Sequence, residues 1–420
     1  MKVLLKKVTI LDKKSTYYNQ QKDILISDGK YSKIADNIQD KEAKQITSNS
    51  LFISQSWVDL KADFNDPGHE YNEDLNSGLN LAANSGFGHI YLVPTTSPIV
   101  DNKAQVNYIL TKNGQHIVEL HPMGTITKEG KGESLSEMYD MFQTGASVFT
   151  DNTSFLSSGI LYRALLYVQN FGGQIVSFPQ DKSLSYHGQI NEGIASLKTG
   201  LRAMPSVGEL IQVQRDLSIL EYTEGKLHFS GISCAESLNL IRKAKKKGLQ
   251  VTCDVYVNHL LFNETATLGF DTNHKVFPPY RTEEDRKELW KAISDGTIDC
   301  IASNHQPKIA DYKDIEFDNA DFGVMSLQSF YASLVDQNLK QHADFIEKIS
   351  SKPREILDFK ENTSINLGNS ADCTLFDPTI TWELNETTNL SKSINSPFYN
   401  KKLKGKAIGI IKRNTVHLNK

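Results

Sequence analysis

Polar and charged side chains follow several short apolar runs of the sequence, and these side chains are the ones that could do chemistry. Lys61 and Asp63 follow one such run, Asp151 closes another, and Asn304 follows a third. A carboxylate can bind a cation, whereas a charged lysine has no lone pair to offer a metal. An amide has no useful pKa for general base catalysis.

The elements that must position these residues alternate between about residues 51 and 360. Short apolar runs alternate there with longer amphipathic stretches, which predicts strands and helices in turn. About eight such units, with no glycine-rich phosphate loop after the first strand, favour an α/β protein with a (β/α)₈ barrel over a doubly wound sheet. The expected strands are 89–94, 117–123, 146–151, 173–178, 226–233, 249–255 and 297–304, and the clearest helices are 235–247 and 283–294. Reactive groups of such a barrel lie at the C-terminal ends of its strands.

Both ends of the chain have a different pattern. The first fifty residues alternate apolar and polar positions around an Asp-Gly pair at 28–29, which predicts a hairpin. The last fifty contain strand-like runs at 371–376, 381–384 and 405–411. We therefore expect a small β-sandwich made of residues 1–50 plus 365–420 beside a barrel of residues 51–364.

Composition excludes several classes of function. The formal net charge is −4 and the sequence pI is about 6.3, so nucleic acid and anionic membranes are not expected as partners. No stretch approaches the ~20 apolar residues of a membrane-spanning helix. The cysteines form no CxxC pair and follow no secretory signal, which predicts reduced thiols and a cytoplasmic protein; they are Cys234, Cys253, Cys300 and Cys373.

Many segments, in order, resemble the type I dihydroorotases of the amidohydrolase superfamily. The matching segments are VDLKADFNDPGHEYNED at 58–74, VPTTSP at 93–98, FTDNTSF at 149–155, SGISCAESLNLIRKAKKKGLQVTCDV at 230–255, DGTIDCIASNHQPK at 295–308 and NLGNSADCTLFDP at 366–378. The resemblance implies a metal-dependent amidohydrolase barrel. It also implies the family's reaction, the reversible hydrolysis of a cyclic amide that interconverts dihydroorotate and carbamoyl aspartate on zinc.

The resemblance also identifies positions where this chain departs from the family. Lys61 and Asp63 stand where the resemblance implies two histidine ligands, and Asp151 matches the metal-binding aspartate. The remaining departures are Phe178 and Gly231 at two further histidine positions and Asn304 at the position of the carboxylate that moves the proton. Of the six positions, Asp151 alone keeps the residue type that the resemblance implies.

The implied substrate pocket is altered as well. The resemblance places an arginine at Asn65 and asparagines at Thr95 and Phe277, and it places a histidine at Lys308. His305 matches the family motif. We therefore regard Asn65, Thr95, Phe277, His305 and Lys308 as a vestigial pocket, in which Phe178 and Phe277 add aromatic bulk.

These departures predict a dihydroorotase-like protein that is not catalytic and carries no metal cofactor, apart from weak cation binding at Asp63 and Asp151. The resemblance implies a structural or regulatory role in pyrimidine biosynthesis, as a homo-oligomer or as a partner of aspartate transcarbamoylase. One alternative is an active dihydroorotase or related cyclic-amide hydrolase with a rebuilt metal site. Another is a small-molecule sensor that uses Lys61, Asn65 and Lys308. We also expect Lys61 to neutralise Asp151.

Overall fold

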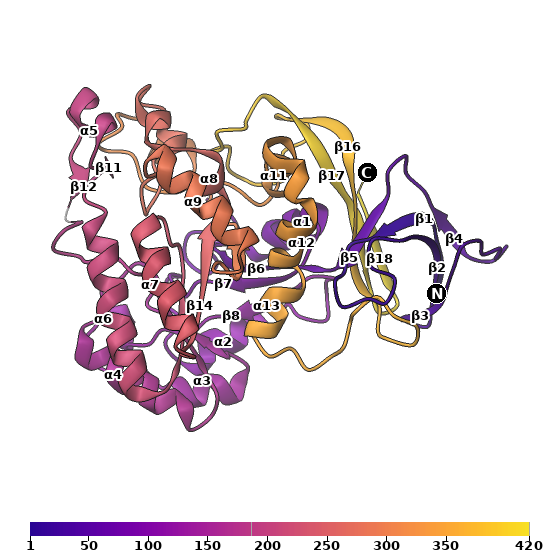
Figure 1. Ribbon diagram of the computed structural model, residues 1–420, viewed down its shortest axis with the longest axis horizontal. Coiled ribbons are helices and arrows are strands. Elements are labelled where there is room, and N and C mark those ends of the chain that lie inside the picture. The colour runs from indigo at the N-terminus through magenta and orange to yellow at the C-terminus, as the bar shows by residue number, and fades with distance from the viewer. Residues whose placement is uncertain (186, 420) are drawn as a thin grey trace.

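A computed structural model describes residues 1–185 and 187–419 of the chain. Figure 1 shows two parts. Helices surround one group of strands, and a separate sheet contains both the indigo strands from the N-terminus and the yellow strands from the C-terminus. The two ends of the chain therefore meet in one sheet, as the sequence predicts.

Eight parallel strands within the described residues form the barrel. They are β6 (Trp57–Ala62), β7 (Phe87–Leu92), β8 (Glu119–Pro122), β9 (Val148–Phe149), β10 (Gln174–Ser177), β13 (Lys226–Phe229), β14 (Gln250–Tyr256) and β15 (Cys300–Ala302). The first three form one ladder and the other five form a second ladder. Parallel bridges from Gly124 to Phe149 and from Ala62 to His305 join the two ladders at both seams. The strands thus close into the (β/α)₈ barrel that the sequence predicts.

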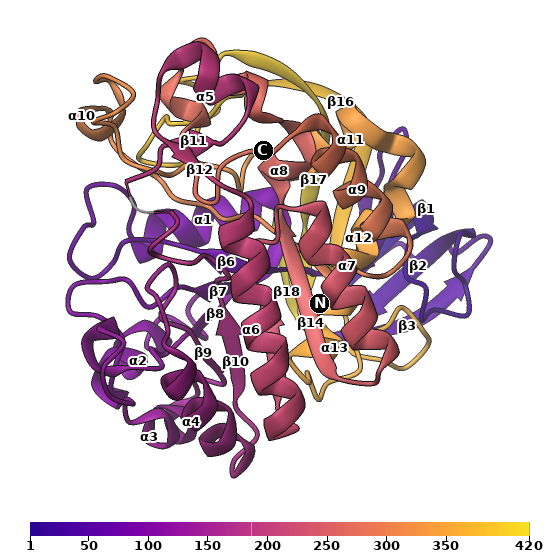
Figure 2. The same ribbon diagram turned by 60° about the vertical axis from the view of Figure 1, so that its left-hand side comes forward.

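Helices cover the outside of the barrel (Figure 2). The helices of the described residues are α1 (Leu75–Ser85), α2 (Lys103–Leu110), α3 (Met138–Thr144), α4 (Ser158–Gln169), α5 (Ile194–Thr199), α6 (Val207–Thr223), α7 (Ala235–Lys246), α8 (Val257–Leu261), α9 (Glu283–Ser294), α10 (Ala310–Lys313), α11 (Phe330–Asn338), α12 (His342–Ile349) and α13 (Ser351–Ile356). Side-chain caps fix where several begin: Asp74 accepts hydrogen bonds from two amides of α1, and Thr282 and Asp285 form a capping box on α9. The segment between β10 and α6 also carries the short strands β11 (Ile190–Asn191) and β12 (Ala203–Met204), on either side of α5.

The second part is a sheet in the order β18-β17-β16-β5-β1-β2-β3, with β4 also paired to β1. Its strands are β1 (Lys2–Ile10), β2 (Gln21–Ser27), β3 (Lys30–Ala35), β4 (Lys44–Ile46), β5 (Phe52–Gln55), β16 (Asp372–Leu384), β17 (Lys401–Lys412) and β18 (Thr415–Leu418). Asp28 and Gly29, both with positive φ, form the predicted hairpin turn between β2 and β3. β5 lies beyond residue 50 yet belongs to this sheet, and the division into 1–50 plus 365–420 and 51–364 stays a prediction.

Buried apolar side chains fill the inside of the barrel as well as the layer between strands and helices. The interior cluster comprises Val58, Leu60, Tyr91, Met123, Val148, Val176, Phe178, Tyr256, Cys300 and Ala302. All four cysteines are buried and free. No helix among the described residues has both the length and the apolar character needed to cross a membrane.

We predict that Leu375→Ala destabilises the protein by about 2–5 kcal/mol, because it removes a fully buried side chain from the core of the terminal sheet. Leu375 lies opposite Ile53 of β5, so the cavity would loosen the contact between the two chain ends. Urea denaturation measures the change. Leu197→Ala, at a leucine that is 86% exposed, is the control and should stay within about 0.5 kcal/mol of the wild type. Equal midpoints for the two variants would contradict the prediction.

Candidate active site at the barrel mouth

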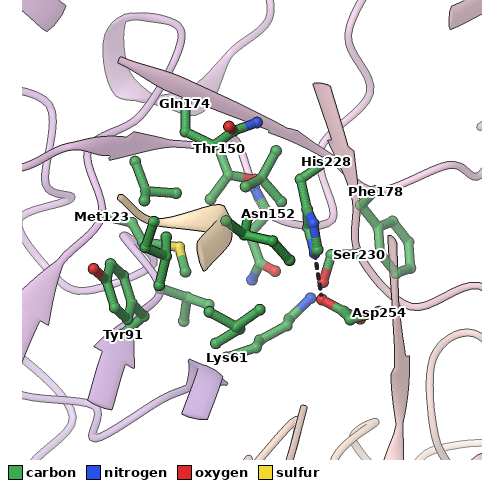
Figure 3. A pocket seen from close by; sticks show the side chains of 16 residues that line it. Lys61, Tyr91, Met123, Thr150, Asn152, Gln174, Phe178, His228, Ser230 and Asp254 are labelled. Atoms are coloured by element: carbon green, nitrogen blue, oxygen red, sulfur yellow. Dashed lines mark hydrogen bonds and ion pairs between the residues drawn. The ribbon is translucent and has the colours of Figure 1, made fainter. Parts of the chain in front are cut away.

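Polar side chains enter the barrel near the C-terminal ends of three strands. Lys61 lies at the end of β6, Ser230 directly follows β13, and Asp254 and Tyr256 lie on β14. Figure 3 shows Lys61 pointing toward Asp254, with Phe178 also at this end of the pocket. Apolar residues make up much of the surrounding wall, including Leu60, Val93, Val148 and Leu357. The mouth therefore combines one buried cation with a largely apolar lining.

Lys61 is the central group of this site. It is 5% exposed, its Nζ donates a hydrogen bond of 2.7 Å to the Tyr256 hydroxyl, and the same atom lies 5.0 Å from the ring centre of Phe178. Burial lowers the pKa of Lys61 to about 8, although the carboxylates of Asp254, Asp63 and Asp59 favour its charged form. A buried ammonium group thus stands at the position where the family resemblance implies a metal ligand.

Sequence reasoning missed the group that faces Lys61. Asp254 accepts hydrogen bonds from the Gly231 amide at 2.7 Å and from His228 Nε2 at 3.0 Å, and His228 also contacts the Thr252 hydroxyl at 2.8 Å. The sequence does contain a pattern that indicates this polar group. Polar residues occupy alternate positions of two consecutive strands, and alternate positions of a strand face the same side.

The mouth has no room for a further ligand at Gly231. A Cβ atom built there would lie 2.5 Å from the Tyr256 ring, and Gly231 has φ +78°. Tyr256 therefore fills the space that a larger side chain at position 231 would need. Phe178 packs against Phe277 with 5.0 Å between ring centres, so two aromatic side chains lie together on this side of the mouth. Lysine, tyrosine and phenylalanine side chains in these places do not fit a zinc ion.

Asp63 and Asp151 have separate partners. Asp151 accepts hydrogen bonds from the amides of Ile126 (2.7 Å) and Thr127 (3.0 Å) and from the Thr127 hydroxyl. Asp63 accepts one from the Asn65 amide at 2.8 Å. Burial raises the pKa of both carboxyl groups. The expectation that Lys61 neutralises Asp151 is wrong, because Lys61 bonds to Tyr256 and backbone amides satisfy Asp151.

The other predicted residues surround this mouth without forming one polar surface. Asn304 is buried with φ +48°, and its side-chain oxygen accepts from Gln306. His305 is fully buried, its Nδ1 accepts from the Ser326 amide at 3.1 Å, and burial lowers its pKa to about 3. Asn65 is buried and Thr95 is exposed. Lys308 forms an ion pair with Asp321 at 3.1 Å. Lys61 and Lys308 thus have partners within the protein.

Comparison with known proteins places this site in a family. A family profile described as dihydro-orotase-like matches residues 51–237. A dihydroorotase from Syntrophotalea carbinolica is 36% identical over 414 residues, covering 97% of each chain, and one from Aquifex aeolicus is 37% identical over 418 residues, covering 98% of each. The chain belongs to the dihydroorotase family.

Solved structures support the fold. L-hydantoinase from Arthrobacter aurescens superimposes with a TM-score of 0.86 at 21% identity, covering 100% of this chain and 96% of its own. A D-hydantoinase gives a TM-score of 0.83 at 19% identity. These neighbours show the amidohydrolase fold, a barrel with a terminal β-sandwich.

The prediction that the chain carries no metal cofactor is contradicted. The relatives are named dihydroorotase, a metal-dependent family. The described residues also include a group that could hold a metal ion, His89, Glu119 and His121. Sequence reasoning missed it because it considered the C-terminal ends of the strands, whereas Glu119 begins β8 and His89 precedes the middle of β7. This group therefore lies at the end of the barrel away from Lys61.

We predict that Lys61 makes stability depend on pH above pH 8. Between its folded pKa of about 8 and its unfolded value of 10.5, the unfolded chain binds a proton that the folded protein has released. The free energy of unfolding therefore rises with pH across this window. Relative to Lys61→Met, the wild type should gain on the order of 3 kcal/mol by pH 10.5.

Urea denaturation of both proteins between pH 7 and 10.5 tests this dependence. Using the difference between wild type and Lys61→Met removes the contribution of other groups that titrate in the same range. Lys226→Met, at an exposed lysine on β13, is the matched control and should follow the wild type. Parallel curves for wild type and Lys61→Met would show that Lys61 does not titrate in this window.

Proposed function

We propose that this protein acts in pyrimidine biosynthesis as a dihydroorotase-family member whose barrel mouth does not hydrolyse the cyclic amide, and that it serves as a structural or regulatory partner of aspartate transcarbamoylase. Relatives named dihydroorotase that match along 97–98% of both chains support the pathway. The chemistry of the mouth supports the non-catalytic role.

One observation carries this proposal. The Lys61 ammonium donates to the Tyr256 hydroxyl at 2.7 Å, and Tyr256 occupies the space beside Gly231. Hydrolysis of an amide in this family needs a polarising metal and a base near its hydroxide. A buried cation at a metal-ligand position repels a second cation, and the amide of Asn304 cannot take a proton.

Exposed apolar side chains support a role in assembly. Tyr222 on α6 is 78% exposed and Ile211 on the same helix is 48% exposed, while Tyr162 and Leu166 on α4 are 39% and 40% exposed. The rings of Tyr162 and Tyr222 lie 6.1 Å apart, so the two helices share one apolar surface. α4 and α6 lie side by side in Figure 2. Apolar patches of this kind are typical of protein interfaces.

A second candidate is an active dihydroorotase, or a related cyclic-amide hydrolase, with a rebuilt metal site. The names of the relatives favour it, because those at 36% and 37% identity are called dihydroorotase. The group of His89, Glu119 and His121 offers possible metal ligands among the described residues, although it lies at the end of the barrel away from Lys61. This candidate requires turnover that responds to metal.

We predict no dihydroorotase turnover in either direction for the purified protein, before or after Zn²⁺ is added. The reason is that no zinc-binding set forms around Lys61, Phe178 and Gly231. The assay follows dihydroorotate and carbamoyl aspartate, with the Aquifex aeolicus relative run in parallel as the reference. Turnover above the buffer blank that disappears with a chelator would establish the second candidate and end the proposal.

We also predict a stable complex when the protein is co-expressed with aspartate transcarbamoylase from the same organism. Tyr222→Ser should weaken this complex, because it removes the most exposed ring of the apolar surface on α4 and α6. Size-exclusion chromatography with light scattering measures the assembly. Tyr71→Ser changes an exposed tyrosine that lies outside these helices and serves as the control. A chain that stays alone, or assembles equally well as Tyr222→Ser, would contradict this interface.

A further inference from the structure

A second polar cluster lies at the opposite end of the barrel, away from Lys61. His89 comes from β7, and Glu119 and His121 come from β8. His89 Nδ1 lies 3.0 Å from His121 Nε2 and 3.6 Å from Glu119 Oε2. Two imidazoles and a carboxylate therefore point three potential ligand atoms at one small region.

These distances suit a transition-metal ion. Nitrogen and oxygen ligands at 2.0–2.2 Å from a tetrahedral zinc ion lie about 3.3 Å from one another. The observed separations of 3.0 and 3.6 Å bracket this value. Two histidines with one carboxylate are a common donor set for zinc and related divalent metals, and such a set leaves a position for water.

A carboxylate on the far side of His89 orients it as a ligand. His89 Nε2 lies 3.0 Å from Asp372 Oδ2, and Asp372 also pairs with Arg354 at 2.9 Å. The ion pair with Arg354 fixes the Asp372 carboxylate, which accepts the hydrogen bond that His89 Nε2 donates. The Nδ1 lone pair of His89 is therefore directed at His121 and Glu119, an arrangement typical of metal-binding histidines.

Lys412 completes the surroundings without occupying the ligand atoms. Its Nζ lies 3.0 Å from Glu119 Oε1, the other oxygen of that carboxylate, and 3.2 Å from His89 Nε2. Glu119 Oε2 remains directed toward His89. The side chain of Glu119 is 30% exposed, whereas that of His89 is 4% exposed. An ion could therefore enter from solvent and contact a buried histidine.

We propose that His89, Glu119 and His121 bind one divalent transition-metal ion of the zinc class at the base of the barrel. The ion would link β7 to β8, and the contact of His89 Nε2 with Asp372 on β16 would connect it to the terminal sheet. Bound there, it stabilises the contact between the two parts of the chain. This site does not depend on the proposed function, since it lies away from the mouth.

Cobalt titration of the chelator-treated full-length protein tests the site, because Co²⁺ bound by nitrogen and oxygen ligands has a distinct visible absorption. We expect one Co²⁺ per chain, displaced by Zn²⁺, and a higher melting temperature in the presence of either ion. Glu119→Gln and His121→Phe should each weaken binding by at least about tenfold, because even changes beyond the direct ligands cost that much. Phenylalanine keeps the stacking of position 121 on Tyr91.

Two further variants distinguish metal binding at the base of the barrel from metal binding at the mouth. Lys412→Met should tighten binding, because it removes a positive charge beside Glu119. Asp63→Asn, at the mouth, should leave binding unchanged. The proposal fails if the wild type binds no Co²⁺, if Glu119→Gln binds like the wild type, or if Asp63→Asn abolishes binding. Circular dichroism checks the fold, and should His121→Phe misfold, the partly exposed Glu119→Gln decides.

Discussion

Closure of the parallel strands is the constraint on which this structure depends. A parallel sheet needs both faces covered, and a closed barrel leaves no unpaired edge. Here two ladders meet at Gly124 with Phe149 and at Ala62 with His305. Because all eight strands run in the same direction, closure brings their ends together in two rings. Every polar residue near a strand end then belongs either to the mouth or to the base.

The two rings have different chemistry. At the mouth, the positive charge belongs to a side chain of the protein. The Lys61 ammonium donates to the Tyr256 hydroxyl and lies over the rings of Phe178 and Tyr256. At the base, neutral imidazoles and a carboxylate face one another, with Lys412 beside them. Burial lowers the pKa of His89 to about 4, so this ring offers a lone pair at neutral pH. The mouth thus contains the positive charge of Lys61, whereas the base contains electron-pair donors that could bind a metal cation.

Much of the fold could be predicted from the sequence, because barrel and sheet are encoded by local patterns. Apolar runs separated by amphipathic stretches identified β7 to β10 and β13 to β15 but not the short strands β11 and β12, and α9 at Glu283–Ser294 has the predicted bounds. Less of the candidate site could be predicted from the sequence. The altered residues at positions 61, 178 and 231 were visible, but the hydrogen bond from Lys61 to Tyr256 depends on how β6 and β14 face each other across the barrel. The separation of Lys61 from Asp151 likewise depends on backbone amides of the loop after β8, which the sequence does not reveal.

The sheet shared by the two chain ends has a consequence for synthesis. β5, at residues 52–55, pairs with β16, which begins at residue 372. At about 5–20 residues per second, a ribosome needs on the order of tens of seconds to make the intervening chain. During that interval one edge of β5 is unpaired. The apolar residues of the first strands also lack Leu375 and its neighbours as packing partners. An unpaired strand edge is a template for association with another chain, so the N-terminal strands are exposed to aggregation until β16 has been made.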